Sequence, residues 1–541
     1  MSILIFLIVS YILLSFSLYM LFPKAGVDAV KGLIPGVNFA EWCKLIGRKP
    51  SYALWLLFPV VNIFIFCGMA VDLVRSFGKL DFTYAAAAVL YAPAAFFKLS
   101  KTTEDKYVGQ TLIREADYAK NLEDAKAKGD TYNLQKLEEN NPYKKSILRE
   151  WTESLVFAVF AASFIRMFLI EAYVIPTPSM EGSLNVGDFL FVSKANYGIR
   201  LPMTVISFPL VHNQLPFSGK ESYLTSPSLP YKRLPAFENV VAGKPFVFNW
   251  PIGDSVYITH QRSYAVSQIK SMPWAMQSDP ELAYKVKNKE YVVRPIDKKD
   301  HYIKRCVAGP GDSLQIKNKQ LYLNGKAVTN PKHLQYHYHV LLPQNITIST
   351  KKLDEWGIDY GDNANYFSKD LFIDGRADLH LDNQQVERLK SLDPNVQVIP
   401  AEQQADPLKL FPFDSIVGSQ NWTVDNYGPI WIPKKGVTIQ LSLKNLPFYT
   451  RIISVYENNK LEVKGQDIFI NGQKTDTYTF KQDYFWAMGD NRHNSEDSRM
   501  WGFVPEDHIV GKPLFIWFST KEGNISNGIN WDRIFKSATK D

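Results

Sequence analysis

The sequence predicts transmembrane helices at its N-terminal end, followed by a mostly-β extracytoplasmic domain that carries large insertions. Uncharged apolar runs of about 20 residues, the length that a helix needs to span a bilayer, lie in the first third of the chain. From Val186 onward the pattern changes to short alternating runs separated by Gly, Pro and Asn, which is typical of strands and turns. A composition of 46% hydrophobic and 14% aromatic residues excludes a disordered chain.

Net charge and cysteine content narrow the possible class of protein further. The formal net charge of +7 is modest for 541 residues and is spread along the chain, so we expect no nucleic-acid partner. The three cysteines, Cys43, Cys67 and Cys306, make no disulfide framework. An outer domain with Cys306 alone must therefore be held together by packing.

Residues 1–98 form the predicted N-terminal membrane region, with spans over 3–22 and 52–71. The first run lacks the basic start and the A-x-A-like site of a cleaved signal peptide, so we interpret it as an uncleaved helix. Residues 84–97 are short, Ala-rich and contain Pro93. The sequence therefore leaves open whether this third stretch crosses, and with it the side of the N-terminus.

A charged segment and a further helix follow the membrane region. Residues 99–150 carry Lys and Arg at both ends and are predicted to be a cytoplasmic loop, in which 107–141 form a charged, solvated helical segment. Residues 151–175 are the transmembrane helix predicted to lead out of this loop. Because Lys and Arg favour the cytoplasmic side, everything after this helix is expected outside, whether or not residues 84–97 cross.

Residues 176–541 are predicted to form the extracytoplasmic β-rich domain. Its expected strands are apolar runs bounded by turn residues: 188–194, 244–251, 301–309, 320–325, 467–472 and 513–519. Asn-Gly pairs at 324–325 and 471–472 indicate hairpins. Three intervals of irregular composition are interpreted as insertions into a smaller β core: about 205–235, 255–300 and 330–425.

Ser179 follows the predicted membrane helix directly, in the sequence IPTPSM at 175–180. Pro178 fixes its own φ angle, and both prolines keep the residues before them extended, so the serine is held on a stiff tether close to the membrane. Thr177 offers a hydroxyl that can join the Ser179 N–H as an oxyanion donor. A turn serine is the simpler interpretation, because serine is a poor nucleophile until a base takes its proton.

Lys304 lies within the apolar run at 301–309. One interpretation is a lysine that points to solvent from the polar face of a strand. The other is a desolvated lysine, whose pKa burial lowers from about 10.4 by several units, so that a neutral amine can accept a proton. The sequence alone leaves the face of the strand open.

The stretch 484–512 is dense in Gly, Asn, Asp, Ser and Arg directly after an apolar run. A charged surface turn is the simpler interpretation, in which two arginines pair with nearby carboxylates: Arg492 and Arg499 with Asp490, Glu496 or Asp497. Against it, the polar residues between Gly489 and Ser498 are flanked on both sides by aromatic and apolar residues. A surface loop seldom needs such flanks.

Together these three stretches resemble bacterial type I signal peptidases, the membrane-bound Ser–Lys endopeptidases that remove signal peptides from exported proteins. The pair Ser179-Met180, ahead of residues 185–202, matches the nucleophile box of that family. YIKRCVAGPGD at 302–312 matches the box of the general-base lysine, and GDNRHNSEDSR at 489–499 matches the last box. GKPFVFNWP at 243–251 is similar to the strand after the first box.

The resemblance implies a signal-peptidase-like β fold and a role for each matched residue. Ser179 and Lys304 would be the catalytic nucleophile and general base, Thr177 would help to form the oxyanion hole, and Ser495 would orient the lysine. The remaining matched residues would give structural support, two of them as an ion pair behind the site: Asp497 with Arg499, beside Gly489 and Asp490.

The same resemblance implies the reaction and its setting. We expect cleavage of signal peptides from exported preproteins after small residues, at A-x-A type sites, with no cofactor and no metal ion. The expected location is the bacterial inner membrane, as a multi-pass protein with a periplasmic catalytic domain, in contact with the bilayer and the secretion translocon. Residues 24–64 and 201–220 look like the form of this enzyme in Bacteroidetes-type bacteria. The long intervals between the boxes suggest that inserted loops line or cover the cleft.

Other interpretations remain open. A Ser–His–Asp hydrolase would use His301 or His493 with Ser179, and a non-catalytic membrane adaptor would keep the fold without the reaction. His337 and His339 share one face of a strand, but two histidines without further ligands are typical of an exposed strand. Four apolar residues are either a surface that rests on the bilayer or core strand residues: Phe189, Phe191, Leu201 and Met203.

Overall fold

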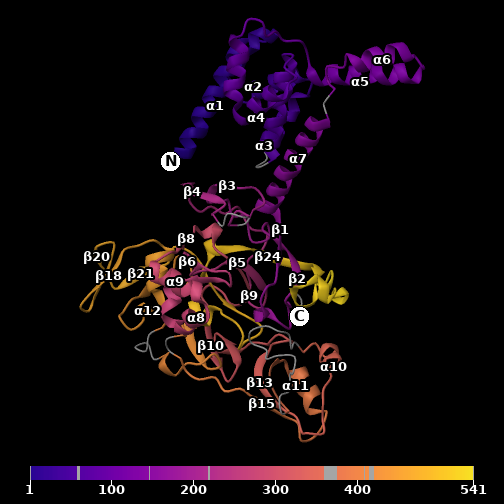
Figure 1. Ribbon diagram of the computed structural model, residues 1–541. Coiled ribbons are helices and arrows are strands. Elements are labelled where there is room, and N and C mark those ends of the chain that lie inside the picture. The colour runs from indigo at the N-terminus through magenta and orange to yellow at the C-terminus, as the bar shows by residue number, and fades with distance from the viewer. Residues whose placement is uncertain are drawn as a thin grey trace. The chain divides into compact units, whose positions relative to one another are not determined.

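The computed structural model divides the chain into two units, Met1–Phe157 and Ala158–Asp541. The first unit is helical and the second is mostly β (Figure 1). The structure describes residues 2–57, 61–144, 147–211, 213–216, 220–358, 375–406, 409–413 and 419–539. Helices followed by a mostly-β body confirm the predicted fold class.

The first unit is built around a buried apolar cluster that includes Trp42, Leu73 and Phe96. Its helices are α1 (Ser2–Leu21), α2 (Val37–Ile46), α3 (Val61–Ser76), α4 (Phe82–Lys101), α5 (Thr111–Ala127), α6 (Thr131–Glu139) and the start of α7 (Ile147–Phe164). Helix α4 packs against both α1 and α3. Helices α5 and α6 confirm the helical segment predicted at 107–141.

Three helical stretches among the described residues are long and apolar enough to cross a membrane: Ile8–Ala25, Phe82–Lys101 and Glu150–Leu169. Within the range 52–71, residues up to Leu57 belong to a 3-10 helix (Pro50–Leu57) and α3 begins at Val61, so the span expected there stays a prediction. Residues 58–60 between them lie outside the described residues. The sequence has Pro59 at this point, and a proline removes a backbone donor and restricts the residue before it.

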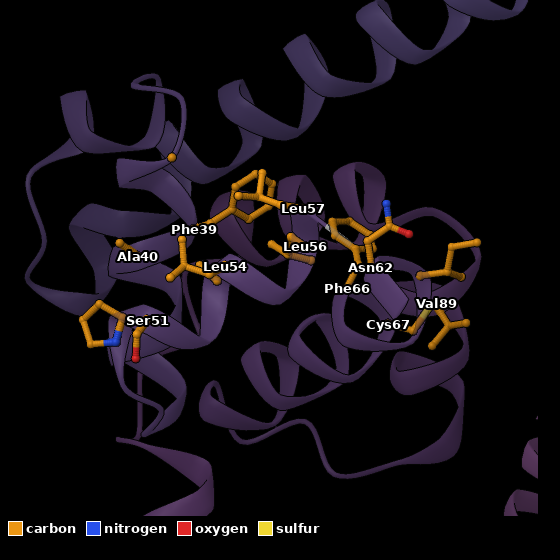
Figure 2. A pocket seen from close by; sticks show the side chains of 14 residues that line it. Phe39, Ala40, Ser51, Leu54, Leu56, Leu57, Asn62, Phe66, Cys67 and Val89 are labelled. Carbon is orange, nitrogen blue, oxygen red and sulfur yellow. The ribbon is translucent and has the colours of Figure 1, made fainter. Parts of the chain in front are cut away.

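An apolar pocket of about 920 Å³ lies in the first unit (Figure 2). Figure 2 shows Phe39, Leu54, Leu57, Phe66 and Val89 among the side chains that line it. None of the residues singled out for chemistry in the sequence is among its lining residues. The serine, the lysine and the last box all lie in the second unit, Ala158–Asp541.

The second unit is organised by a seven-stranded sheet with the order β1-β2-β24-β5-β9-β22-β23. Every neighbouring pair is antiparallel. The strands are β1 (Ile170–Val174), β2 (Asp188–Ser193), β24 (Ile509–Ser519), β5 (Pro245–Asn249), β9 (His301–Ala308), β22 (Tyr484–Met488) and β23 (Val504–Pro505). Four of the six predicted strands lie in this sheet, so the sequence located most of its centre.

Three of the shorter sheets are built from strands in the second half of the chain. They are formed by β10 (Ser313–Lys317), β11 (Gln320–Leu323), β12 (Lys326–Ala327) and β16 (Tyr427–Trp431); by β17 (Thr438–Gln440) and β21 (Thr477–Thr479); and by β18 (Leu461–Lys464), β19 (Asp467–Ile470) and β20 (Gln473–Lys474). Both Asn-Gly pairs connect hairpin strands, with φ of 51° and 78° at Asn324 and Gly325 and 54° and 82° at Asn471 and Gly472. Two positive φ angles in succession define the tight turn that Asn-Gly favours.

The three predicted insertions carry secondary structure of their own. The first insertion contains β3 (Thr204–Ser207) and β4 (Tyr223–Ser228). The second contains β6 (Ser255–Ile258), β7 (Ser263–Ala265), β8 (Val292–Val293), α8 (Pro273–Ser278) and α9 (Pro280–Asn288). The third contains β13 (Tyr336–Leu341), β14 (Arg376–Leu381), β15 (Gln397–Pro400), α10 (Thr350–Glu355) and α11 (Asn383–Lys390). The second and third insertions each bury a small apolar cluster. Parts of the first and third lie outside the described residues: 212, 217–219, 359–374, 407–408 and 414–418.

The central sheet buries apolar side chains on both faces. On β5, Phe246 and Phe248 belong to one cluster, whereas Val247 between them belongs to another. This alternation follows from the two-residue period of a strand. The nucleophile box and the lysine box therefore meet at a sheet that is covered on both sides.

Candidate active site

Three segments far apart in the sequence meet at this sheet. Ser179 lies in a 3-10 turn, η5 (Pro178–Met180), between β1 and β2. Lys304 is in β9, and the box at 489–499 begins directly after β22, the neighbour of β9. The antiparallel pairing of β9 with β22 thus brings the second and third boxes together.

Ser179 is held by its neighbours in sequence and by the last box. Thr177 is extended, with φ −136° and ψ 150°, as expected before a proline, and Pro178 opens the 3-10 turn. The Ser179 carbonyl accepts a hydrogen bond from the Asn491 N–H at 3.2 Å. The serine is buried, with 8% of its surface exposed. Both ends of the residue are therefore fixed before any substrate arrives.

Lys304 faces Ser179 from the strand. Its Nζ lies 2.7 Å from Ser179 Oγ and donates to the Ile303 carbonyl at 3.1 Å. Along β9, Lys304 shares a strand face with Tyr302 and Cys306, which pack in the apolar cluster around Phe246. The question that the sequence left open is thus answered, because the lysine side chain lies inside, with 3% of its surface exposed.

The environment of Lys304 favours a neutral amine. Burial lowers its pKa to about 8, while the carboxylates of Asp497, Glu496 and Asp490 oppose this shift. The hydrogen-bond partners of Nζ among the described residues are a hydroxyl and a carbonyl, neither of which is charged. Desolvation outweighs the distant carboxylates because none of them makes an ion pair with the ammonium.

Two further hydroxyls lie near Ser179. Thr177 Oγ1 is 3.5 Å from Ser179 Oγ, and either atom can be the donor. Ser495 lies across Gly489, and both its Oγ and the Ser179 carbonyl oxygen are 2.3 Å from the point where a Cβ on Gly489 would lie. Among the described residues, no hydrogen bond joins Ser495 to Lys304.

Gly489 is required by this close approach. A Cβ at 2.3 Å from a backbone carbonyl is far inside van der Waals contact, so any larger residue would displace Ser179 or Ser495. The Gly489 N–H donates to Asp497 Oδ2 at 3.1 Å, which ties the strand end to the ion pair behind the site. This close approach gives a geometric reason for the supporting role that the sequence predicts for Gly489.

The last box is held by buried ion pairs rather than exposed as a surface turn. Arg499 Nε and Nη2 donate to the two Asp497 oxygens at 2.9 and 2.7 Å, and both residues have no exposed surface. Asp490 makes a second two-pronged pair with Arg305, at 2.8 and 2.6 Å. Such buried charges need their partners, because either one left alone would be costly.

Arg305 is a residue that the sequence analysis missed. It follows Lys304 directly, is 2% exposed, and also donates to the Gly243 carbonyl at 2.7 Å. A charged residue inside an apolar strand run was the only signal available for it. Its pairing with Asp490 fixes β9 to the start of the last box, next to the lysine.

The second insertion also reaches the site. Arg262 Nη2 lies 2.7 Å from Glu496 Oε2, and both side chains are partly exposed, at 37% and 30%. Glu496 is one of the carboxylates that raise the pKa of Lys304 against the effect of burial. An inserted residue therefore neutralises a charge that acts on the lysine.

The two histidines considered as alternative bases have other partners. His493 Nε2 lies 2.8 Å from Asp425 Oδ1, and the ring of His301 packs against Tyr173 at 4.9 Å. Within the described residues, Ser179 Oγ bonds to Lys304 and Thr177 and to no histidine. The geometry therefore favours a lysine over a histidine as the partner of this serine.

The four apolar residues near the membrane helix divide into two groups. Phe189 and Phe191 are half-buried and pack against the ring of Trp517, with centroid distances of 5.7 and 5.6 Å. Met203 is buried and Leu201 is half-buried. Met203 is thus a core residue, and a bilayer-facing role for the two phenylalanines stays a prediction.

Comparisons with known proteins match the part of the chain that carries these residues. The family described as signal peptidase, peptidase S26, matches residues 148–359 and 455–518, which together are about half of the chain and include all three boxes. Residues 30–110 match a family of unknown function, DUF5684. The match to the first family begins in α7 and ends in β24, so it follows the second unit.

Curated relatives cover most of the chain at low identity. Signal peptidase I of Buchnera aphidicola subsp. Baizongia pistaciae (strain Bp) is 23% identical over 397 residues, 72% of this chain and 84% of that protein. Signal peptidase I of Helicobacter pylori (strain J99 / ATCC 700824) is 22% identical over 398 residues, 71% of this chain and 91% of that protein. The protein of the same name from Pseudomonas aeruginosa strain PAO1 is 22% identical over 72% of this chain and 80% of its own length.

Proposed function

Because the chain belongs to the signal peptidase family, peptidase S26, and is therefore a membrane-associated serine peptidase of the signal peptidase I type, we propose that Ser179 is its nucleophile and Lys304 its general base. The observation that carries this proposal is the 2.7 Å contact between Lys304 Nζ and Ser179 Oγ in a buried environment. Its substrates are exported preproteins, and the bond that it cuts lies at the end of their signal peptides.

The first half of the reaction forms an acyl-enzyme. Neutral Lys304 accepts the Ser179 hydroxyl proton while Oγ attacks the scissile carbonyl carbon. The oxyanion that forms is stabilised by the Ser179 N–H and the Thr177 hydroxyl. The Lys304 ammonium then gives its proton to the leaving amine as the C–N bond breaks, and the signal peptide stays attached to Ser179 as an ester.

The second half returns the enzyme to its starting state. A water molecule loses a proton to Lys304 and attacks the ester, and the ammonium then returns that proton to Ser179 Oγ as the C–O bond breaks. Ser495 is proposed to orient the lysine during this cycle, since it lies across Gly489 from Ser179. Asp497 with Arg499, and Asp490 with Arg305, fix the loop that carries it.

Substrate choice and placement follow from the family resemblance. We propose cleavage after small residues at A-x-A type sites, by a multi-pass inner-membrane protein whose second unit lies on the periplasmic side. The candidate span Glu150–Leu169 ends ten positions before Ser179, which supports a site close to the bilayer surface. A preprotein still held by its signal peptide, or by the translocon, presents its cleavage site at that depth.

A cleavage assay on the full-length protein in detergent tests the proposal. The substrate is a precursor with an A-x-A site, and mass spectrometry identifies the cut. Ser179→Ala and Lys304→Ala are expected to lower kcat/KM by at least about a thousandfold, because each removes a member of one reacting unit. Thr177→Val should cost about a hundredfold if it removes an oxyanion donor, whereas Thr177→Ser should retain activity.

The controls separate this proposal from its alternatives. Ser495→Ala should cost about tenfold as an orienting residue, within the range of an outer partner. His301→Ala and His493→Ala should retain cleavage. Loss of cleavage in either histidine variant, with cleavage retained by Lys304→Ala, would point to a histidine base. An inactive wild-type protein would favour a membrane adaptor.

A further inference from the structure

The third insertion places four ligand-type side chains on one face of two paired strands. In the antiparallel register of β13 and β14, His337 is opposite His380 and His339 is opposite Asp378. Residues two apart on a strand share a face, and directly opposed residues share it too. Three imidazoles and one carboxylate therefore form a square on the same side of the ladder.

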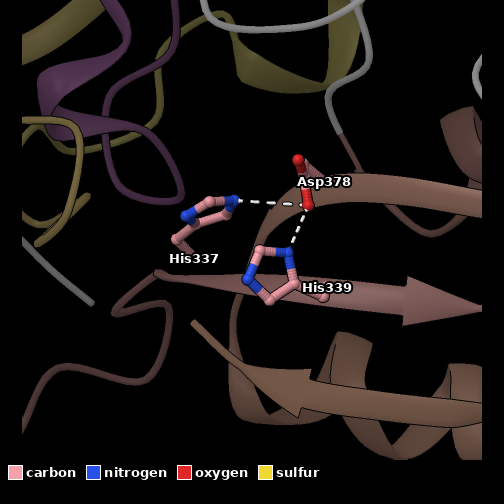
Figure 3. Close-up of side chains that lie close together, drawn as sticks. All are labelled: His337, His339 and Asp378. Carbon is pink, nitrogen blue, oxygen red and sulfur yellow. Dashed lines mark hydrogen bonds and ion pairs between the residues drawn. The ribbon is translucent and has the colours of Figure 1, made fainter. Parts of the chain in front are cut away.

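Three of these side chains converge closely. His339 Nδ1 lies 2.5 Å from Asp378 Oδ1, and His337 Nε2 lies 3.7 Å from the same oxygen. One potential ligand atom from each residue lies within 4.8 Å of those of the other two. Figure 3 shows both imidazoles turned toward the Asp378 carboxylate. The ring of His380 stacks on that of His337, with centroids 5.2 Å apart and an angle of 13°.

These distances suit one small cation after a modest adjustment. Zinc is bound at about 2.0–2.2 Å by histidine nitrogen and carboxylate oxygen, so tetrahedral ligands lie about 3.4 Å apart. The longest separation must shorten by little more than 1 Å, which side-chain rotations can supply. The His339 and Asp378 side chains are 50% and 40% exposed, so they can turn and a cation can reach them.

Other histidine–carboxylate pairs in the second unit lack this convergence. His333 Nδ1 lies 2.9 Å from Asp382 Oδ2, and His260 Nδ1 lies 2.7 Å from Glu281 Oε2. Each has one imidazole and reads as an ordinary ion pair. Across the described ranges, one group of three or more His, Cys, Asp or Glu side chains meets in a way that could hold a metal ion. Strand β14 supplies the further ligand, Asp378, that the sequence pattern of His337 and His339 lacked.

We propose that His337, His339 and Asp378 bind one divalent transition-metal ion of the zinc class. A set of two imidazoles and one carboxylate suits Zn²⁺, Cu²⁺ or Ni²⁺ and disfavours Mg²⁺ and Ca²⁺, which prefer oxygen ligands.

The site lies at a junction with the last box. Just before β13, the Gln335 N–H donates to the Asp490 carbonyl at 3.0 Å, and the Arg492 N–H donates to the Gln335 carbonyl at 2.9 Å. Asn491 between them donates to the Ser179 carbonyl. A metal ion that joins β13 to β14 would therefore brace the insertion where it meets the catalytic segment.

The test is a metal titration of the full-length protein in detergent, without a histidine tag and after chelator treatment. Isothermal calorimetry with Zn²⁺ is expected to show one ion per chain, and mass spectrometry of the intact protein should show the same count. His339→Ala and Asp378→Asn should each weaken binding at least about tenfold, the loss that removal of even an outer partner can cause. Both side chains are partly exposed, so these variants are expected to fold.

The matched control is His260→Ala, which removes an imidazole from an isolated pair and should bind Zn²⁺ as the wild type does. Co²⁺ provides a second measurement, because imidazole ligation in a tetrahedral site gives visible absorption that His337→Ala should abolish. The proposal is overturned if no stoichiometric Zn²⁺ binds, or if His339→Ala and Asp378→Asn bind it as tightly as the wild type. The readout is metal binding, so it is independent of whether Ser179 and Lys304 catalyse cleavage.

Discussion

Two buried lysines only five positions apart lie in sites that look alike and differ in one partner. Lys304 and Lys299 are each 3% exposed, and burial lowers the pKa of each to about 8. Lys304 Nζ faces the hydroxyl of Ser179 at 2.7 Å. Lys299 Nζ instead lies 2.9 Å from His508 Nε2 and 3.3 Å from the Pro251 carbonyl.

The partners of Lys299 form a closed polar chain. His508 Nδ1 lies 2.6 Å from Asp507 Oδ1, and burial, followed by the charge of Lys299, lowers the pKa of His508 to about 4. A neutral His508 can donate from Nδ1 to Asp507 and accept at Nε2 from Lys299. Lys299, His508 and Asp507 thus bind one another and the Pro251 carbonyl, and none of these partners is a hydroxyl that the amine could activate.

The comparison teaches that a low lysine pKa is not sufficient for a catalytic base. Desolvation makes both amines easier to deprotonate. Only the lysine within hydrogen-bond reach of a hydroxyl can take part in nucleophilic attack. The function is therefore set by which strand residue faces the tethered serine.

The largest expected difference comes from replacing each lysine by methionine. Lys304→Met, like Lys304→Ala, should lower kcat/KM by at least about a thousandfold, in the upper part of the usual range for a general base. Lys299→Met should keep cleavage within a few-fold, because its site contains no reacting group. Precursor cleavage measured on both purified variants checks this.

A thermal melt separates chemistry from folding in that experiment. Lys299→Met leaves His508 Nε2 without its donor and should lower the melting temperature, since an unpaired buried acceptor costs about 1–3 kcal/mol. Equal losses of activity in two folded variants would show that the lysines are not functionally distinct.

A smaller effect is expected from Gly489→Ala. Its Cβ would lie 2.3 Å from the Ser179 carbonyl oxygen, so the serine must move away from Lys304. A displacement of about 1 Å can cost about a hundredfold in rate. Gly309→Ala is the matched control, because the nearest atom to its Cβ would be 3.8 Å away. Cleavage by Gly489→Ala at the wild-type rate would contradict the close packing described for this position.

The smallest effect is a shift of the pH profile. The amine of Lys304 is neutral only above its pKa of about 8, so kcat/KM should rise with pH up to that value and level off above it. Arg262→Ala unpairs Glu496, whose charge then favours the ammonium, and should move the rising limb to higher pH by a few tenths of a unit. Glu496→Gln removes the charge and should move it to lower pH.

The two opposite shifts make the pH experiment selective. Glu281→Gln, in a partly exposed ion pair of the same insertion that does not act on Lys304, should leave the limb where it is. If none of these variants shifts the rising limb of the pH profile, the group that titrates near pH 8 is not Lys304. The same depressed pKa predicts that burial of the Lys304 ammonium costs stability below about pH 8, and that this cost fades as the pH rises toward the ordinary lysine value.

Much of the second unit could be predicted from local sequence. The strands at 188–194, 244–251 and 301–309 carry apolar runs between turn residues, and each is a strand in the sheet. The Asn-Gly turns were predictable because few other residue pairs adopt two positive φ angles in succession. Local patterns also located all three boxes, since each is continuous in sequence.

The membrane region was harder to predict. A run of hydrophobic residues at 52–71 satisfies a count of apolar length, yet the structure has a 3-10 helix before Val61. The number of crossings and the side of each loop stay predictions.

The sequence by itself determined the chemistry that is available: a serine between prolines, a lysine in an apolar strand and an Asp–Arg-rich box. The tertiary structure decided what those groups do. It placed Lys304 on the inner face of β9 and paired Asp490 with Arg305. It also brought His380 opposite His337 and Asp378 opposite His339. The physical reason is that burial and strand register depend on partners distant in the chain, and pKa and ligand geometry depend on both.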